Sequence, residues 1–160
     1  MSILGWQSVS MFQNFNEKVQ TITDDDLPSI RNVLLIKDLI SQNDALALKI
    51  LQFKDSDGLT DWKEELDNNY KELETLLNDY GTLISTAKEK KIFDELLTAI
   101  ENYRNTEQQI MNVTSTPTTG DGQTLGDQFE KKREEIGQCI VKLVQLNEQN
   151  ASESSTFIDD

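Results

Sequence analysis

Apolar residues recur along the chain at helical spacing in four stretches, which three short polar breaks separate. In residues 29–53, steps of three and four place one stripe on a single helix face. The stripe consists of Val33, Ile36, Ile40, Ala47 and Ile50, and Asn43 takes the one step that lacks an apolar residue. Residues 6–23 have compatible spacing, so we expect a very long first helix. Pro28 follows an acidic run and lacks an amide donor, which predicts a kink or a restart there.

The other three stretches repeat this pattern. The most regular stripe is the second, with Trp62, Leu66, Tyr70, Leu73, Leu77, Tyr80, Ile84 and Ala87. The third has Phe93, Leu96, Ile100, Tyr103, Ile110 and Val113, and the fourth has Leu125, Phe129, Ile136, Ile140, Leu143 and Leu146. We place the breaks near 54–60, 86–91 and 114–123. In the first break, Gly58 is expected to supply a positive φ, and Thr60 or Asp61 to cap the next helix.

The scarcity of turn-forming residues decides the fold class. Seven glycines and two prolines in 160 residues are too few for a many-stranded β fold. Short connections make neighbouring helices antiparallel, so the sequence predicts an all-α protein, an antiparallel up-down-up-down four-helix bundle. We expect a single domain over residues 1–160, with long first and last helices that protrude at the end holding both termini.

Charge and the missing residue types narrow the function. Lys plus Arg number 15 against 29 Asp plus Glu, and no cluster of cations is available to bind nucleic acid. Histidine is absent and Cys139 is the lone cysteine, which removes the common catalytic and zinc-binding arrangements. Residues 55–65 have the composition of a calcium loop, but alignment on Gly58 puts Phe53 where the first acid belongs. We therefore expect no enzyme, no metal and no cofactor.

Three segments, together with this arrangement, resemble the four-helix-bundle sensor domain of bacterial methyl-accepting chemotaxis proteins. They are DDDLPSIRNVLLIKDL at 24–39, KEKKIFDELLTAIENYR at 88–104 and IVKLVQLNEQNA at 140–151. The resemblance covers nearly the whole chain. It implies a periplasmic or extracellular homodimeric domain of an inner-membrane receptor, whose flanking membrane spans are absent from this chain. Such a domain binds a small molecule and passes a helix displacement to a cytoplasmic signalling domain.

Two alternatives remain beside the chemotaxis receptor. The same domain type also precedes histidine kinases and nucleotide cyclases. A helical bundle that acts through a partner protein, without a small ligand, is the other. Membrane spans on both sides of this domain in the parent gene favour the receptor, whereas a free-standing reading frame of this length excludes it.

Four residues about ten positions from the first and third breaks lie at one height in such a bundle: Asn43, Tyr70, Tyr103 and Arg133. The first three replace aliphatic residues in their stripes. A buried amide or phenol costs roughly 1 to 3 kcal/mol unless a partner satisfies it, and a ligand is one such partner. The alternative is that the tyrosines direct their hydroxyls outward and Asn43 bonds one of them, which sets the helix register.

Arginine suits a bidentate grip on a carboxylate, and the chain has three: Arg31, Arg104 and Arg133. Arg104 beside Tyr103 resembles the aromatic-plus-arginine lining of the family's organic-acid-type receptors. We therefore expect a small carboxylate ligand, an organic acid or an amino acid. Its predicted site consists of Tyr70, Tyr103, Arg104 and Arg133, with Asn43 and Thr106 nearby.

Arg31 marks a rival site. It resembles the first-helix arginines with which amino-acid-type receptors of the family grip a ligand across the dimer interface. Taken alone, an arginine is more often a member of a surface ion pair, and this alternative stands for all three. Lys37 and Lys132 are weaker candidates for the same role.

The first helix has more apolar residues than one core face requires. Besides the core stripe it carries Leu34, Leu35, Leu39, Leu46 and Leu48. A helix that is apolar on more than one side has to be covered on more than one side. We expect the bundle to cover one face and a second subunit to cover the other, which predicts a weak homodimer.

Overall fold

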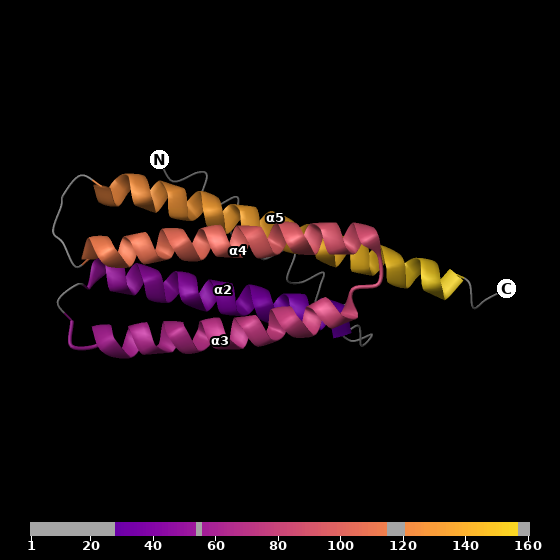
Figure 1. Cartoon of the computed structure of the whole chain (residues 1–160), viewed down its shortest axis with the longest axis horizontal. Helices are drawn as coiled ribbons and strands as arrows, with labels where there is room; N and C mark the ends of the chain where they lie inside the picture. Colours follow the sequence, from indigo (N-terminus) through magenta and orange to yellow (C-terminus); the bar gives the residue numbers. More distant parts are fainter. Residues whose placement is uncertain (1–27, 54–55, 115–120, 157–160) are drawn as a thin grey trace.

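The computed structural model describes residues 28–53, 56–114 and 121–156. For residues 113–114, 121–125 and 154–156 it describes the backbone alone. Four helices account for nearly all of this: α2 (Pro28–Gln52), α3 (Leu59–Leu83), α4 (Ala87–Thr114) and α5 (Asp121–Thr156). The all-α four-helix fold predicted from the sequence is confirmed. Figure 1 shows that α2 and α4 end, and α3 and α5 begin, at one end of the bundle and that the α3–α4 turn lies at the other, so successive helices run antiparallel.

Helix α2 begins at Pro28, where the sequence predicts a restart. Proline suits a first helical turn, because its missing amide would have no partner inside the helix there. The helix predicted for residues 6–23 lies outside the described residues.

The turn between α2 and α3 corrects two predictions, one about the backbone of Gly58 and one about the cap of the next helix. Its φ is −79°, an ordinary right-handed value, and it is the N-cap of α3, without a side-chain hydrogen bond from Thr60 or Asp61. A Cβ atom at Gly58 would lie 3.2 Å from two carbons of the Trp62 ring. Close contact with Trp62, and not an unusual backbone angle, is therefore what favours glycine here.

The other two breaks are shifted from their predicted positions. Helix α3 ends at Leu83 and α4 begins at Ala87, so the turn predicted at 86–91 was wrong and most of it is helical. The reason is capping: Thr86 Oγ1 accepts a hydrogen bond from the Glu89 amide at 3.1 Å, and Glu89 Oε2 accepts one from the Ser85 amide. Helix α5 begins at Asp121, inside the loop predicted at 114–123.

The helices pack as two pairs around one core. Helix α2 packs on α3 and α4 packs on α5, and α2 also contacts both α4 and α5. The predicted stripe residues of α2 are all buried, and Leu66, Leu73 and Tyr80 continue the core on α3. The stripe predicted for residues 62–87 is buried or packs against the core, except at Ala87, which is exposed at the start of α4.

Helix α5 extends past the α3–α4 turn and forms one end of the molecule (Figure 1). Asn147 of α5 reaches Tyr80 near the end of α3, so the residues that follow Asn147 extend beyond the bundle. This agrees with the predicted protrusion of the last helix. Within the described residues, no helix combines the length and apolarity that a membrane span needs.

Candidate functional site

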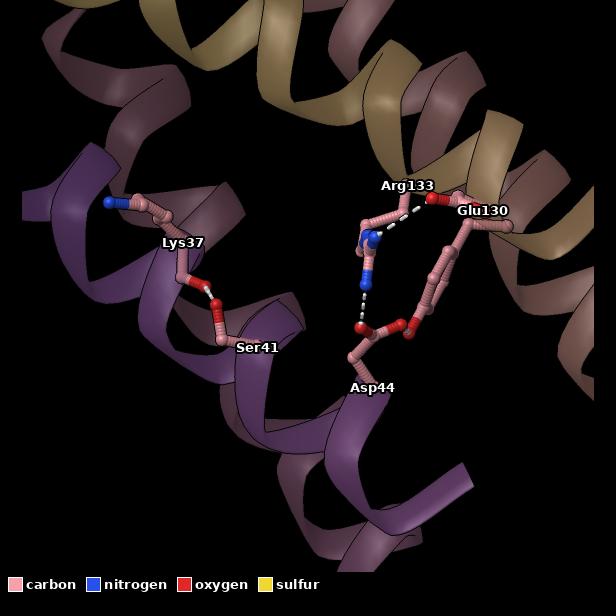
Figure 2. A network of polar contacts seen from close by, with 6 residues as sticks. Lys37, Ser41, Asp44, Glu130 and Arg133 are labelled. Atoms are coloured by element: carbon pink, nitrogen blue, oxygen red, sulfur yellow. Dashed lines mark hydrogen bonds and ion pairs between the residues drawn. The ribbon is translucent and has the colours of Figure 1, made fainter. Parts of the chain in front are cut away.

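Three helices meet in a polar contact at the predicted height. Asp44 on α2 accepts a hydrogen bond from the Tyr103 hydroxyl of α4 at 3.3 Å and one from Arg133 Nη1 of α5 at 2.6 Å. Figure 2 shows Arg133 reaching down from α5 toward Asp44, with Glu130 on its other side at 3.8 Å from Nη2. The residues that the sequence placed in one layer, Tyr103 and Arg133, are therefore connected through Asp44.

The electrostatics of this contact favour its charged form. Burial alone would lower the pKa of Arg133, but the hydrogen bond and the charge of Asp44 outweigh it, so the pKa rises above its usual value. Burial, and then the Asp44 charge, raise the pKa of Tyr103 well above its usual range, so its hydroxyl stays protonated and donates. Arg133 thus already grips a carboxylate, one that belongs to the protein itself.

Four residues on α2, α3 and α4 have buried polar atoms that the protein does not satisfy. Among the side chains that the structure describes, five buried atoms have no hydrogen-bond partner: Asn43 Oδ1 and Nδ2, Asn69 Nδ2, Tyr70 Oη and Glu107 Oε2. Asn43 is fully buried and Glu107 is 1 % exposed. Each such atom, when truly desolvated, costs about 1 to 3 kcal/mol. We call these four residues the open cluster.

Glu107 is the charged member of the open cluster. Burial raises its pKa to about 8, and the negative charges of Asp44 and Asp67 add to this effect. The neighbouring Tyr70 hydroxyl and the Arg104 guanidinium act in the opposite direction and favour the ionised form. Tyr70 Oη lies close enough to influence Glu107, yet neither it nor Glu107 Oε2 has a hydrogen bond of good geometry.

The remaining predicted residues lie at different distances from this layer. Arg104 lies over the Tyr70 ring, with its guanidinium carbon 4.5 Å from the ring centroid. Thr106 is buried, and its hydroxyl donates to the Asn102 carbonyl oxygen at 3.0 Å. Arg31 is exposed near the start of α2, twelve residues before Asn43, which is roughly 18 Å along a helix.

Lys37 and Lys132, the weaker candidates, differ in burial. Lys37 is buried on α2, and burial lowers its pKa. Figure 2 places it near Ser41, one turn from Asp44; the bond drawn between them joins the Ser41 hydroxyl to the Lys37 carbonyl oxygen. Lys132 forms a half-exposed ion pair with Glu135 on its own helix.

Two residues at the centre of the layer, Asp44 and Glu107, were missed by the sequence analysis. A signal was present for both, because Asp44 falls between Ile40 and Ala47, and Glu107 between Tyr103 and Ile110, at steps of four and three. Acidic residues are normally exposed, so they were not assigned to the core.

A second polar cluster lies at the α3–α4 turn, and its hydrogen bonds are complete. The Tyr80 hydroxyl donates to Glu89 Oε1 at 2.7 Å and accepts from Asn147 Nδ2 at 2.9 Å. Glu89 Oε2 accepts from the Ser85 amide at 3.1 Å and its hydroxyl at 3.4 Å. We call Tyr80, Ser85, Glu89 and Asn147 the closed cluster.

Two surface features lie apart from the layer. An open groove of about 740 Å³ runs between α4 and α5, and Lys90, Lys91, Glu95 and Lys142 are among its lining residues. On α2, Leu39 and Leu46 are covered by the bundle itself and Leu34 packs against the core. Leu35 and Leu48 remain 44 % and 46 % exposed.

Comparison with known proteins agrees with this architecture. Residues 1–159 match the model of a family described as a four helix bundle sensory module for signal transduction. The chain is also 23 % identical over 150 residues to YvaQ of Bacillus subtilis (strain 168), whose name marks it as a predicted sensory transducer protein. That match covers 94 % of this chain and 26 % of the relative, so the chain spans about a quarter of its length. No solved structure matches the chain significantly.

Proposed function

The chain belongs to the family of four-helix-bundle sensory modules for signal transduction, and on this premise we propose that it is the extracytoplasmic sensor domain of a membrane-anchored chemotaxis receptor. The match over residues 1–159 carries the proposal. A second support is the similarity to a relative named as a sensory transducer. The chain corresponds to about a quarter of that relative. Helix α5, which runs on past the bundle, is suited to passing a displacement from the sensing layer toward the membrane.

The ligand proposed for this domain is a small carboxylate, an organic acid or an amino acid. Arg104 at the exposed edge of the layer and the half-exposed Arg133 supply the cations, and Asn43 supplies an amide without a partner. The net charge of −14 repels anions from most of the surface, so a carboxylate site has to provide cations locally. The observation that favours this layer is the set of buried donors without an acceptor, Asn43 Nδ2, Asn69 Nδ2 and the Tyr70 hydroxyl, which the oxygens of a ligand carboxylate could accept from.

A thermal-shift screen of organic acids and amino acids tests this ligand class. A compound at 100 times its dissociation constant stabilises the domain by roughly 2.7 kcal/mol, which raises the melting temperature by several degrees. Arg104→Ala should weaken binding of a hit by about thirtyfold, or about 2 kcal/mol. Arg133→Ala should do the same, but it also leaves Asp44 unpaired, so its stability without ligand is measured alongside.

The rival site gives the opposite result. If Arg31→Ala abolishes the hit while Arg104→Ala leaves it intact, the ligand binds near the start of α2 and not in the layer. If no compound shifts the melting temperature, the domain acts through a partner protein, and the carboxylate proposal is rejected.

We also propose that the domain forms a weak homodimer through α2. The exposed Leu35 and Leu48 support it, because large apolar side chains at the surface favour association, although their spacing places the two on different sides of α2. Sedimentation should show association that depends on concentration, and Leu35→Glu should abolish it. The matched control is Leu97→Glu, at a 38 % exposed leucine on α4, which should leave association unchanged. A strict monomer at high concentration, with and without ligand, would exclude the dimer.

A further inference from the structure

Glu107 stands out among the buried groups because its surroundings do not provide for its charge. It is 1 % exposed, and Oε2 has no hydrogen-bond partner. The two amides on the other helices of the open cluster, Asn43 on α2 and Asn69 on α3, also retain unused donors. A carboxylate that is permanently ionised in such a place normally has several aligned donors or a close cation.

The charged and titratable groups around Glu107 come from all four helices. They are Asp44 on α2, Asp67 and Tyr70 on α3, Tyr103 and Arg104 on α4, and Arg133 on α5, which is engaged by Asp44. Two of these groups are acids that repel a charge on Glu107. The guanidinium of Arg104 lies over the Tyr70 ring and also acts electrostatically on Glu107. This balance favours a neutral Glu107 and makes its charged form one that the bundle has to accommodate.

We propose that Glu107 makes the layer a proton sensor, in which loss of its proton loosens the packing of α4 against α2 and α3. With the proton bound, the carboxyl is neutral and needs no counter-ion. Once the proton leaves to solvent, a charge remains in the core beside Asp44 and Asp67, and it is relieved when water enters or when Arg104 leaves the Tyr70 ring. This function rests on the sensory family and on this layer, and not on the carboxylate ligand.

The pKa near 8 sets the pH range in which the effect should be seen. Because it lies above the usual 4.5 of an unfolded chain, the folded state holds the proton more tightly. The resulting stabilisation is complete below about pH 4.5, decreases as the pH rises from there to about 8, and is absent above that. In that range the folding constant should fall by up to tenfold per pH unit through this group alone.

Carboxyl ¹³C NMR of the 160-residue chain measures the protonation of Glu107 directly. We expect one glutamate with a midpoint near pH 8, missing in Glu107→Gln and retained in Glu101→Gln, an exposed position on the same helix. Arg104→Ala should move the midpoint upward, because the guanidinium favours the ionised form. If every glutamate titrates below about pH 6, or if Arg104→Ala leaves the midpoint unchanged, the proposed charge balance is wrong.

Amide hydrogen exchange, corrected for its intrinsic pH dependence, tests whether the proton moves the helices. Between pH 6.5 and pH 9, protection around residues 67–70 and 103–110 should fall by about thirtyfold in the wild type and in Glu101→Gln. In Glu107→Gln, which mimics the neutral acid, it should stay constant. A midpoint near 8 without any change in protection would overturn the sensor proposal. Loss of the pH response with retained binding of a carboxylate would separate this proposal from the proposed ligand site.

Discussion

Glu89 and Glu107 lie on the same face of α4, about 27 Å apart along the helix, and both are 1 % exposed. Glu89 accepts hydrogen bonds from Tyr80 and from Ser85, whereas Glu107 Oε2 has no hydrogen-bond partner. The protein thus completes one buried carboxylate from its own chain and leaves the other incomplete. The closed cluster around Glu89 is suited to joining the α3–α4 turn to α5. The open cluster around Glu107 is suited to responding to a proton or a ligand.

The largest expected effect comes from a charge placed in the core between the two clusters. Leu73 on α3 is 1 % exposed and lies between Tyr70 and Tyr80, which belong to one cluster each. Leu73→Asp should destabilise the domain by about 4 kcal/mol or more, because the new carboxylate has no partner. Circular dichroism during urea unfolding measures this, and Leu73→Met, a change of similar volume, should cost under about 1.5 kcal/mol. A cooperative transition near the wild-type midpoint would show that this core tolerates unpartnered charge.

The next effect tests whether the closed cluster is held by its own hydrogen bonds. Glu89→Ala removes the acceptor for the Tyr80 hydroxyl and the Ser85 amide, so buried donors lose their partner. We expect a loss of roughly 3 kcal/mol in the free energy of unfolding. The control is Glu101→Ala, at an exposed position on the same helix, which should change stability by less than about 0.5 kcal/mol. Equal values for the two variants would remove the distinction between the clusters.

Two asparagine substitutions, one in each cluster, should change the free energy of unfolding in opposite directions. Asn43→Leu removes two buried atoms without partners and should stabilise the domain by about 1 kcal/mol. Asn147→Leu removes the donor to Tyr80 and should destabilise it by about 1 kcal/mol. Thermal and urea unfolding of both variants in one buffer gives the comparison. A clear loss of stability in Asn43→Leu would mean that this amide has a hydrogen-bond partner in solution. Asn43 would then not belong to the open cluster.

The smallest effect sets a baseline for polar contacts outside both clusters. Lys90 and Asp94 form an ion pair at 2.9 Å, with side chains 65 % and 55 % exposed. Lys90→Ala should cost at most about 0.5 kcal/mol, because water and salt screen such a pair. The same urea experiment at low and high salt measures it. A loss comparable to that of Glu89→Ala would mean that surface pairs contribute as much as buried ones in this acidic protein.

The spacing of apolar residues in the sequence was enough to predict the four helices and their buried faces. The α2 stripe at Val33, Ile36 and Ile40 is buried as predicted, since a periodicity of 3.6 leaves one helix face to cover. Helix ends were less predictable. The start of α4 depends on hydrogen bonds among Ser85, Thr86 and Glu89, which outweigh the apolar pattern that continues to Ala87.

The polar contacts were decided only by the tertiary structure. The sequence placed Tyr103 and Arg133 at one height, because equal distances from a turn give equal heights in an antiparallel bundle. That Asp44 joins them depends on the rotation of three helices, since the partners lie 59 and 89 residues away in the chain. The same rotation buries Glu107, which lies on the apolar stripe between Tyr103 and Ile110 although an acidic residue is normally exposed. Helix rotation follows from the packing of the whole core, which no local pattern contains.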